Sequence, residues 1–165
     1  MSRRGERHPH KKKHPKKPRP EPVVPLSEAE RVTKCRQEFQ KALMHLAEAE
    51  RIASVEGAPN ACVHSAYYAM HHCAAAAILA AGGVGKRGDV PQSHEHVIQH
   101  YGNLIASEQG FLGQSGMVLS RARTDRMVAD YDLSRGVTNS EAAQTVSDAR
   151  KFIDACRTRW NLRST

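Results

Sequence analysis

The amino-acid sequence predicts an all-α protein, folded as an antiparallel bundle of four to five helices in a single domain. Three observations lead to this prediction. Apolar side chains recur at helical spacing along most of the chain. Aromatic residues make up only 5% of the sequence, and alanine is concentrated between residues 61 and 81. Alanine favours closely packed helices, whereas a strand-rich core would need more β-branched and aromatic residues.

A compositional boundary near Pro25 separates a short basic tail from the folding part of the chain. Residues 1–25 contain nine Lys or Arg against two Glu, a net charge of +7, whereas the remainder contains sixteen basic and fifteen acidic side chains, a net charge of +1. Six of the eight prolines also lie in the tail, where they remove backbone donors and fix φ. We therefore expect a disordered, proline-rich tail at 1–25 and one helical domain at 26–165.

Two long helices are predicted in the first half of the domain. Ser27 and Glu30 form a capping box that starts an amphipathic helix, which ends near Gly57. A second helix begins around Pro59 and runs to Gly82, and it is apolar around most of its circumference. A helix of that kind must be covered on nearly all sides, so we expect it to be the central helix.

Glycine-rich segments separate the next two helices. After a connector at 82–92, Ser93 is expected to cap a shorter helix. Residues 107–116 contain three glycines, which predict a break in the helical pattern. A fourth helix is therefore expected from Met117 to about Ala129 or beyond.

The last helix has the clearest start. A loop at 133–137 precedes Thr138, which forms a second capping box with Glu141. Apolar residues then recur at helical spacing as far as Trp160. This helix completes the predicted bundle.

The four cysteines and the apolar segments bear on the compartment. The cysteines show no CxxC spacing, and no apolar run is long enough to cross a bilayer. The N-terminus has no hydrophobic segment of the kind found in signal peptides. We therefore expect reduced, mostly packed thiols, a cytoplasmic location, and no membrane contact, metal or cofactor.

Three motifs follow one another at helix-scale spacings. They are SAYYAMHH at 65–72, a loop with Lys86 or Arg87 that leads to His94, and RMVADYD at 126–132. Together they resemble the HEPN superfamily, in the branch of small stand-alone prokaryotic proteins with YYA and ADY helix motifs. The resemblance covers residues 28–158 and excludes the basic tail. It implies a helical bundle that forms homodimers and works in a toxin-antitoxin or other defence pair, often beside a nucleotidyltransferase.

The resemblance also implies an activity that this sequence places in doubt. Many HEPN proteins are metal-independent endoribonucleases, which use an Arg followed after four to six residues by a His. Here Arg126 is followed by Asp130 and Tyr131, and no histidine occurs after position 100. The first hypothesis is therefore a catalytically silent binding or regulatory protein that binds nucleic acid. The alternatives are a metal-independent endoribonuclease toxin and a structural adaptor that recognises only protein.

Two groups of side chains are candidates for a pocket or dimer cleft. Arg126 and Asp130 lie one helical turn apart, with Arg123 one turn earlier and Tyr131 adjacent. On the second helix, a stripe at i, i+3, i+4, i+7 spacing contains His64, Tyr67, Tyr68 and His71. If the stripe faces the arginines, the two groups form a pocket. The alternative is a structural ion pair and a packing stripe with a polar edge.

A relocated active site at Arg87 and His94 is a further possibility. Six residues separate the two, which satisfies the spacing of the family's catalytic pair, and both precede the usual catalytic helix. The alternative is a loop cation and a histidine that merely starts a helix near the second helix. Candidate catalytic residues are thus Arg126, Tyr131, Arg87 and His94.

The basic tail is a candidate nucleic-acid-binding arm. Its cations can contact phosphates and release counterions, and they include Lys11, Lys12, Lys13, Lys16, Lys17 and Arg19. The tail has no aromatic residue to stack on bases, so binding to RNA or DNA should be poorly sequence-selective. The alternative is a basic extension that only improves solubility.

Overall fold

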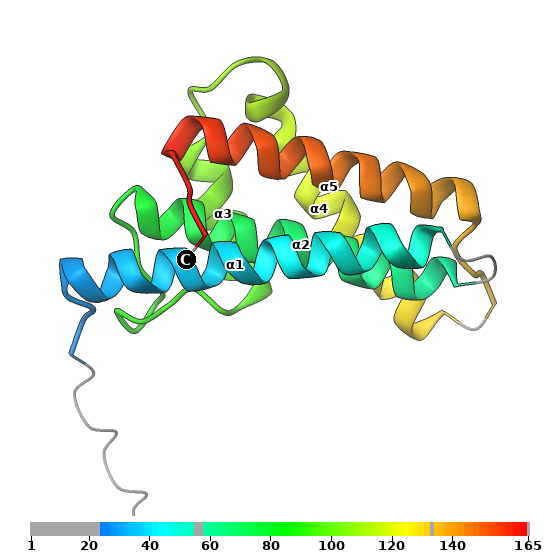
Figure 1. Ribbon diagram of the computed structural model, residues 1–165, viewed down its shortest axis with the longest axis horizontal. Coiled ribbons are helices and arrows are strands. Elements are labelled where there is room, and N and C mark those ends of the chain that lie inside the picture. Colours follow the sequence, from blue (N-terminus) through cyan, green and yellow to red (C-terminus); the bar gives the residue numbers. More distant parts are fainter. Residues whose placement is uncertain (1–23, 55–57, 133, 165) are drawn as a thin grey trace, which may run out of the picture.

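The computed structural model describes residues 24–54, 58–132 and 134–164, and within these ranges the chain forms five α helices (Figure 1). They are α1 (Glu28–Ala53), α2 (Pro59–Ala80), α3 (His94–Leu104), α4 (Gly110–Tyr131) and α5 (Asn139–Trp160). No strand occurs in these ranges, and the predicted all-α bundle is confirmed. Residues 1–23, and with them nearly all of the predicted tail, lie outside the described residues.

The start of α1 is fixed by the predicted capping box. The Glu30 backbone N–H donates to Ser27 Oγ at 3.3 Å, and the Ser27 backbone N–H donates to Glu30 Oε2 at 2.9 Å. Two backbone donors that would otherwise lack a partner are thereby satisfied. The helix buries Phe39, Ala42 and Ala49.

The predicted central position of α2 is confirmed, because α2 packs against each of the other four helices. Every side chain from Cys73 to Leu79 is buried, and the alanines among them allow neighbouring helices to approach closely. Figure 1 shows α1 and α2 side by side in opposite directions, and α5 packs against both. Despite this apolar character, none of the described helices combines the length and hydropathy needed to cross a membrane.

Around α3, one prediction was only partly right. Ser93 does occupy the cap position before His94, but its side chain accepts no hydrogen bond from the helix. Val97 and Tyr101 anchor this short helix in the core. The buried Tyr101 hydroxyl forms a 2.8 Å hydrogen bond with Ser115 Oγ, which ties α3 to α4.

The predicted break at residues 107–116 was only partly right: α3 ends at Leu104, but α4 begins at Gly110 rather than at Met117. A side chain at position 113 would collide with the backbone carbonyl of Glu108. At Gly116, an added Cβ would lie only 3.3 Å from Ile105 Cδ1. These glycines permit a close approach between the first turns of α4 and the segment before them, so here they are helical packing residues.

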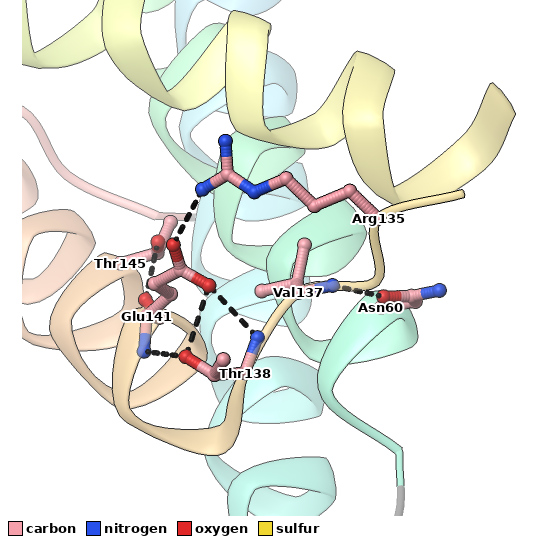
Figure 2. A network of polar contacts seen from close by, with 6 residues as sticks. All are labelled: Asn60, Arg135, Val137, Thr138, Glu141 and Thr145. Carbon is pink, nitrogen blue, oxygen red and sulfur yellow. Dashed lines mark hydrogen bonds and ion pairs between the residues drawn. The ribbon is translucent and has the colours of Figure 1, made fainter. Parts of the chain in front are cut away.

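The start of α5 is anchored to the start of α2 (Figure 2). The Thr138 and Glu141 capping box forms as predicted, with the Thr138 backbone N–H donating to Glu141 Oε2 at 2.8 Å. Arg135 Nη2 also donates to Glu141, at 2.9 Å. The Val137 backbone N–H donates to Asn60 Oδ1 at 3.2 Å. The segment after α4 is therefore held at one end of the bundle, and this contact positions the end of α4 beside α2.

Candidate functional site

Arg126 and Asp130 form the expected ion pair on α4, with 2.7 Å between Arg126 Nε and Asp130 Oδ2. The buried Nε–H group is not aligned for a hydrogen bond despite this short distance, so we treat the contact as electrostatic. The guanidinium carbon lies 5.7 Å from the centre of the Tyr68 ring and 5.8 Å from that of Tyr131. Only 15% of the Arg126 side chain is exposed. Arg126 is thus held between an acid and two aromatic rings.

The stripe on α2 faces this part of α4, as the pocket interpretation requires. His64 Nδ1 lies 3.2 Å from Asp130 Oδ1, so Asp130 is contacted from both helices. Tyr67 and His71 are buried, whereas His64 and Tyr68 are partly exposed. The stripe therefore has a buried part that belongs to the core and an accessible edge beside Arg126.

His94, the first residue of α3, joins the same cluster. Its Nδ1 lies 2.7 Å from the Tyr67 hydroxyl oxygen. The centre of its ring is 4.8 Å from that of His71 and 5.9 Å from that of Tyr68. Arg87 is exposed and forms no hydrogen bond or ion pair with His94 within the described ranges. The structure thus brings His94 to Tyr67 and α2, while a catalytic pairing of Arg87 with His94 stays a prediction.

Burial and nearby charge favour the neutral forms of three groups in this cluster, Tyr67, His94 and His71. Burial raises the pKa of Tyr67 to about 12, so the phenol is protonated. Burial, followed by the positive charges of Arg126 and Arg123, lowers the pKa of His94 below 6.5. Burial, and then the repulsion from His94, lowers the pKa of His71 to about 3. At neutral pH these three rings are therefore neutral, and the charges of Arg123 and Arg126 act on His94.

Two features leave this cluster with unused hydrogen-bonding capacity. His71 Nδ1 is buried and has no hydrogen-bond partner among the residues described. The Arg123 side chain is about one-third exposed, and its Nη2 lies 3.7 Å from Oε1 of the exposed Glu95. This distance is typical of a weak surface ion pair. An anion that entered beside Arg123 would therefore displace little existing structure.

A second group of polar residues, which the sequence did not indicate, continues the cluster onto α1. The rings of His45 and His72 are stacked, with centres 5.4 Å apart and planes 2° from parallel. His72 Nδ1 lies 2.6 Å from Glu38 Oε2. Burial would raise the pKa of Glu38, but the contacts from His72 and Lys41 hold it below its usual value. Glu38, Lys41 and His45 recur at i, i+3/i+4 spacing, a signal that the apolar pattern of the helix obscures.

The remaining expectations concern metal binding, the cysteines and the basic tail. Within the described part of the chain, no group of three or more His, Cys, Asp or Glu side chains is arranged to hold a metal ion. The four cysteines are free, and three of them are buried. The candidate nucleic-acid-binding residues of the tail, Lys11, Lys12, Lys13, Lys16, Lys17 and Arg19, lie outside the described residues.

Comparison with known proteins identifies a family for most of the chain. The family model described as "HEPN domain" matches residues 36–159. This range includes α2, α3, α4 and all but the last residue of α5, and hence every residue of the cluster. A search of curated proteins found no match.

Proposed function

The chain belongs to the HEPN family, and from this premise we propose that it is a phosphate-binding module that does not cleave RNA. We propose further that it acts as one half of a toxin-antitoxin or other defence pair, which is the role that the family resemblance implies. The ligand we propose is the phosphodiester group of RNA, bound beside α2, α3 and α4.

The hydrogen bond between Tyr67 and His94 carries this proposal. The hydroxyl of Tyr67 is fully buried, and His94 is its only hydrogen-bond partner among the described residues. If the hydroxyl accepted a hydrogen bond from His94 Nδ1–H, its own O–H would have no acceptor, which costs about 1–3 kcal/mol. Tyr67 therefore donates to His94 Nδ1, and the proton of the neutral imidazole is placed on Nε2. His94 is thus a hydrogen-bond donor at Nε2.

The Nε2–H donor of His94, near two arginines, can contribute to an anion-binding site. Arg123 and Arg126 both lower the pKa of His94, which means that their charges lie near its ring. The Nε2–H of His94 can donate to one phosphate oxygen, while the guanidinium of Arg123 supplies positive charge. Arg126 holds Asp130, so that the carboxylate is neutralised before the anion arrives.

Cleavage by the usual chemistry of the family requires a proton acceptor that these residues do not supply. With its proton on Nε2, His94 has no free lone pair at that atom. Asp130 is engaged by Arg126 and His64. These properties support binding over catalysis.

The metal-independent endoribonuclease is the second candidate, and one observation favours it: His94 supplies near Arg126 the histidine that α4 lacks. In that case His94 would take the proton of the 2′-hydroxyl while the 2′-oxygen forms a bond to phosphorus. The bond from phosphorus to the 5′-oxygen would break, and that oxygen would take up a proton. The products would be a 2′,3′-cyclic phosphate and a 5′-hydroxyl.

A titration with uridylyl-3′,5′-uridine separates the two candidates, because this compound offers one phosphodiester as both ligand and substrate. We expect the imidazole NMR signals of His94 to shift saturably while the compound stays intact. His94→Ala should abolish binding. His96→Ala is the matched control, since His96 lies on the same helix but faces the Val84 carbonyl. Absence of any shift would refute the phosphate site, and a 2′,3′-cyclic product would favour the nuclease.

The exposed side of α4 supports a protein partner. Met117, Met127 and Tyr131 are exposed, and their spacing places them on one face of this helix. We propose that this face forms a homodimer. Because Tyr131 also contacts Arg126, such a dimer would place two phosphate sites close together. The nucleotidyltransferase partner and the adaptor that recognises only protein stay open as alternatives for the same face.

A further inference from the structure

A groove at one end of the bundle lies outside the α2–α3–α4 cluster. Its volume is about 490 Å³, and it is lined by the first turns of α1, the end of α2 and residues 160–163. Figure 1 shows the C-terminal segment returning toward α1, so the two ends of the domain meet here. Leu79 and Leu162, both buried, contribute apolar lining.

The groove carries an excess of positive charge that the fold does not neutralise. Arg31, Arg36 and Arg163 line it together with one acidic residue, Glu28. None of the three arginines forms an ion pair with another residue in the described ranges, whereas Arg135, Arg150 and Arg159 elsewhere on the surface do. Arg31 Nη1 donates to the Leu79 carbonyl at 3.2 Å, which fixes its guanidinium at the groove. An anionic ligand is therefore the complementary occupant.

An aromatic ring lies among these charges. Trp160, at the end of α5, lines the groove and is partly exposed. The buried Tyr101 supports the indole with its ring centre 6.1 Å away at a steep angle. Arginines beside an accessible aromatic ring are the combination that binds single-stranded nucleic acid, because phosphates pair with the cations and a base stacks on the ring.

The basic tail starts beside the same groove. The Leu26 backbone N–H donates to the Gly88 carbonyl at 2.9 Å, which holds the chain just before α1. Glu28, two residues later, already lines the groove. The nine Lys and Arg residues of the tail therefore connect to the fold at this end of the bundle.

We propose that the groove between α1, α2 and the C-terminal segment binds single-stranded nucleic acid, with phosphates on Arg31, Arg36 and Arg163 and a base against Trp160. The groove supplies the aromatic contact that the tail lacks. This inference does not rest on the phosphate site at His94.

The full-length chain offers a direct readout, since Trp160 is its only tryptophan. We expect a short oligouridylate to quench Trp160 fluorescence saturably in low salt. The double variant Arg36→Glu, Arg163→Glu should weaken binding by at least about tenfold. The double variant Arg51→Glu, Lys151→Glu is the control. It changes the net charge equally, at exposed positions that form no ion pair with a described residue.

Two further measurements make the test decisive. Trp160→Phe, followed by the anisotropy of a labelled oligouridylate, should weaken binding by roughly tenfold if a base stacks on the indole. Thermal melting of each variant checks that the fold is intact, and Arg36→Gln with Arg163→Gln replaces the charge reversal if it unfolds. Binding without quenching, or equal weakening by both charge-reversal pairs, would overturn the proposal, because the tail alone would then account for the affinity.

Discussion

At the scale of single residues, the hydrogen bond from Tyr67 to His94 has the largest functional consequence. It joins a phenol whose pKa is raised to about 12 to an imidazole whose pKa is lowered. Both groups are therefore neutral over the physiological range, and the direction of the bond decides which nitrogen carries the proton. With the proton on Nε2, this atom of His94 donates hydrogen bonds; with the proton on Nδ1, it would instead accept protons.

The state of His94 can be measured directly. We expect ¹⁵N NMR of the imidazole to show the proton on Nε2 at neutral pH, and to show a pKa below 6.5 because burial and two arginines disfavour the charged ring. Tyr67→Phe removes the donor and should leave a mixture of both tautomers. A proton on Nδ1 in the wild-type protein would contradict the proposed direction of the bond.

His71 should make stability depend on pH. Its pKa falls from 6.5 in the unfolded chain to about 3 in the folded protein, chiefly through burial. The unfolded chain therefore binds a proton at a higher pH than the folded protein does, so the contribution of His71 to stability is complete above pH 6.5 and is lost as the pH falls toward 3. At 1.36 kcal/mol per pKa unit, the loss by about pH 4 is up to about 3 kcal/mol.

Urea unfolding at several pH values, for the wild type and His71→Leu, isolates this effect. The free energy of unfolding of the wild type should fall more steeply between about pH 6.5 and pH 4. Carboxylates such as Glu38 titrate in both proteins and cancel in the comparison. Parallel pH profiles would show that His71 is not the group responsible.

Apart from the conditional pocket between the α2 stripe and the arginines of α4, the sequence predicted only residue contacts that are local in the chain. Arg126 and Asp130 lie one turn apart, so their pairing follows from helix geometry. The contacts of Tyr67 with His94 and of His72 with Glu38 join residues far apart in the sequence. No local spacing encodes these contacts, because they depend on how α1 and α3 pack against α2.

At the scale of elements, α4 shows why glycine is an ambiguous signal. Its first turns contain Gly110, Gly113 and Gly116, which predicted a break, yet the helix runs through them. The helices that were predicted with well-defined starts, α1 and α5, have capping boxes whose hydrogen bonds are local. The close approach between Gly113 and Glu108 depends on how the segment just before α4 enters the helix, and no spacing in the sequence indicates it.

Alanine substitutions distinguish a packing glycine from a neutral one. Gly113→Ala should destabilise the protein by about 1–3 kcal/mol, because its Cβ would collide with the Glu108 carbonyl. Gly102→Ala, in α3, is the matched control, since an added Cβ there meets nothing within 4 Å. It should stabilise by roughly 0.5–1 kcal/mol through helix propensity alone. Equal effects in thermal melts would argue against the packing role.

The proposed dimer face of α4 is also tested at this scale. Met127→Glu places a charge among the exposed apolar residues of α4 and should weaken self-association at least about tenfold. Met44→Glu makes the same substitution at an exposed methionine of α1, outside the proposed face, and should leave self-association unaffected. Sedimentation equilibrium measures both. A wild-type chain that is monomeric at all concentrations would remove the homodimer from the proposal.

At the scale of the whole molecule, the fold class, the central helix and the family followed from composition, periodicity and three short motifs. The functional account did not, because it depends on bringing the start of α3 to the stripe of α2 and the charged end of α4. The same folding places a basic groove with Trp160 beside the origin of the tail. Positive charge thus lies on two surfaces, and we propose that each binds phosphate.

The most direct test of the central claim, that this HEPN-family chain binds phosphodiesters without cleaving them, is an RNA cleavage assay of the purified full-length protein in the presence of a chelator. We predict intact RNA after prolonged incubation with wild type, with His94→Ala and with Arg126→Lys. Fragments with 2′,3′-cyclic phosphate ends that appear with the wild type and disappear with His94→Ala would contradict the account and establish His94 as a catalytic residue.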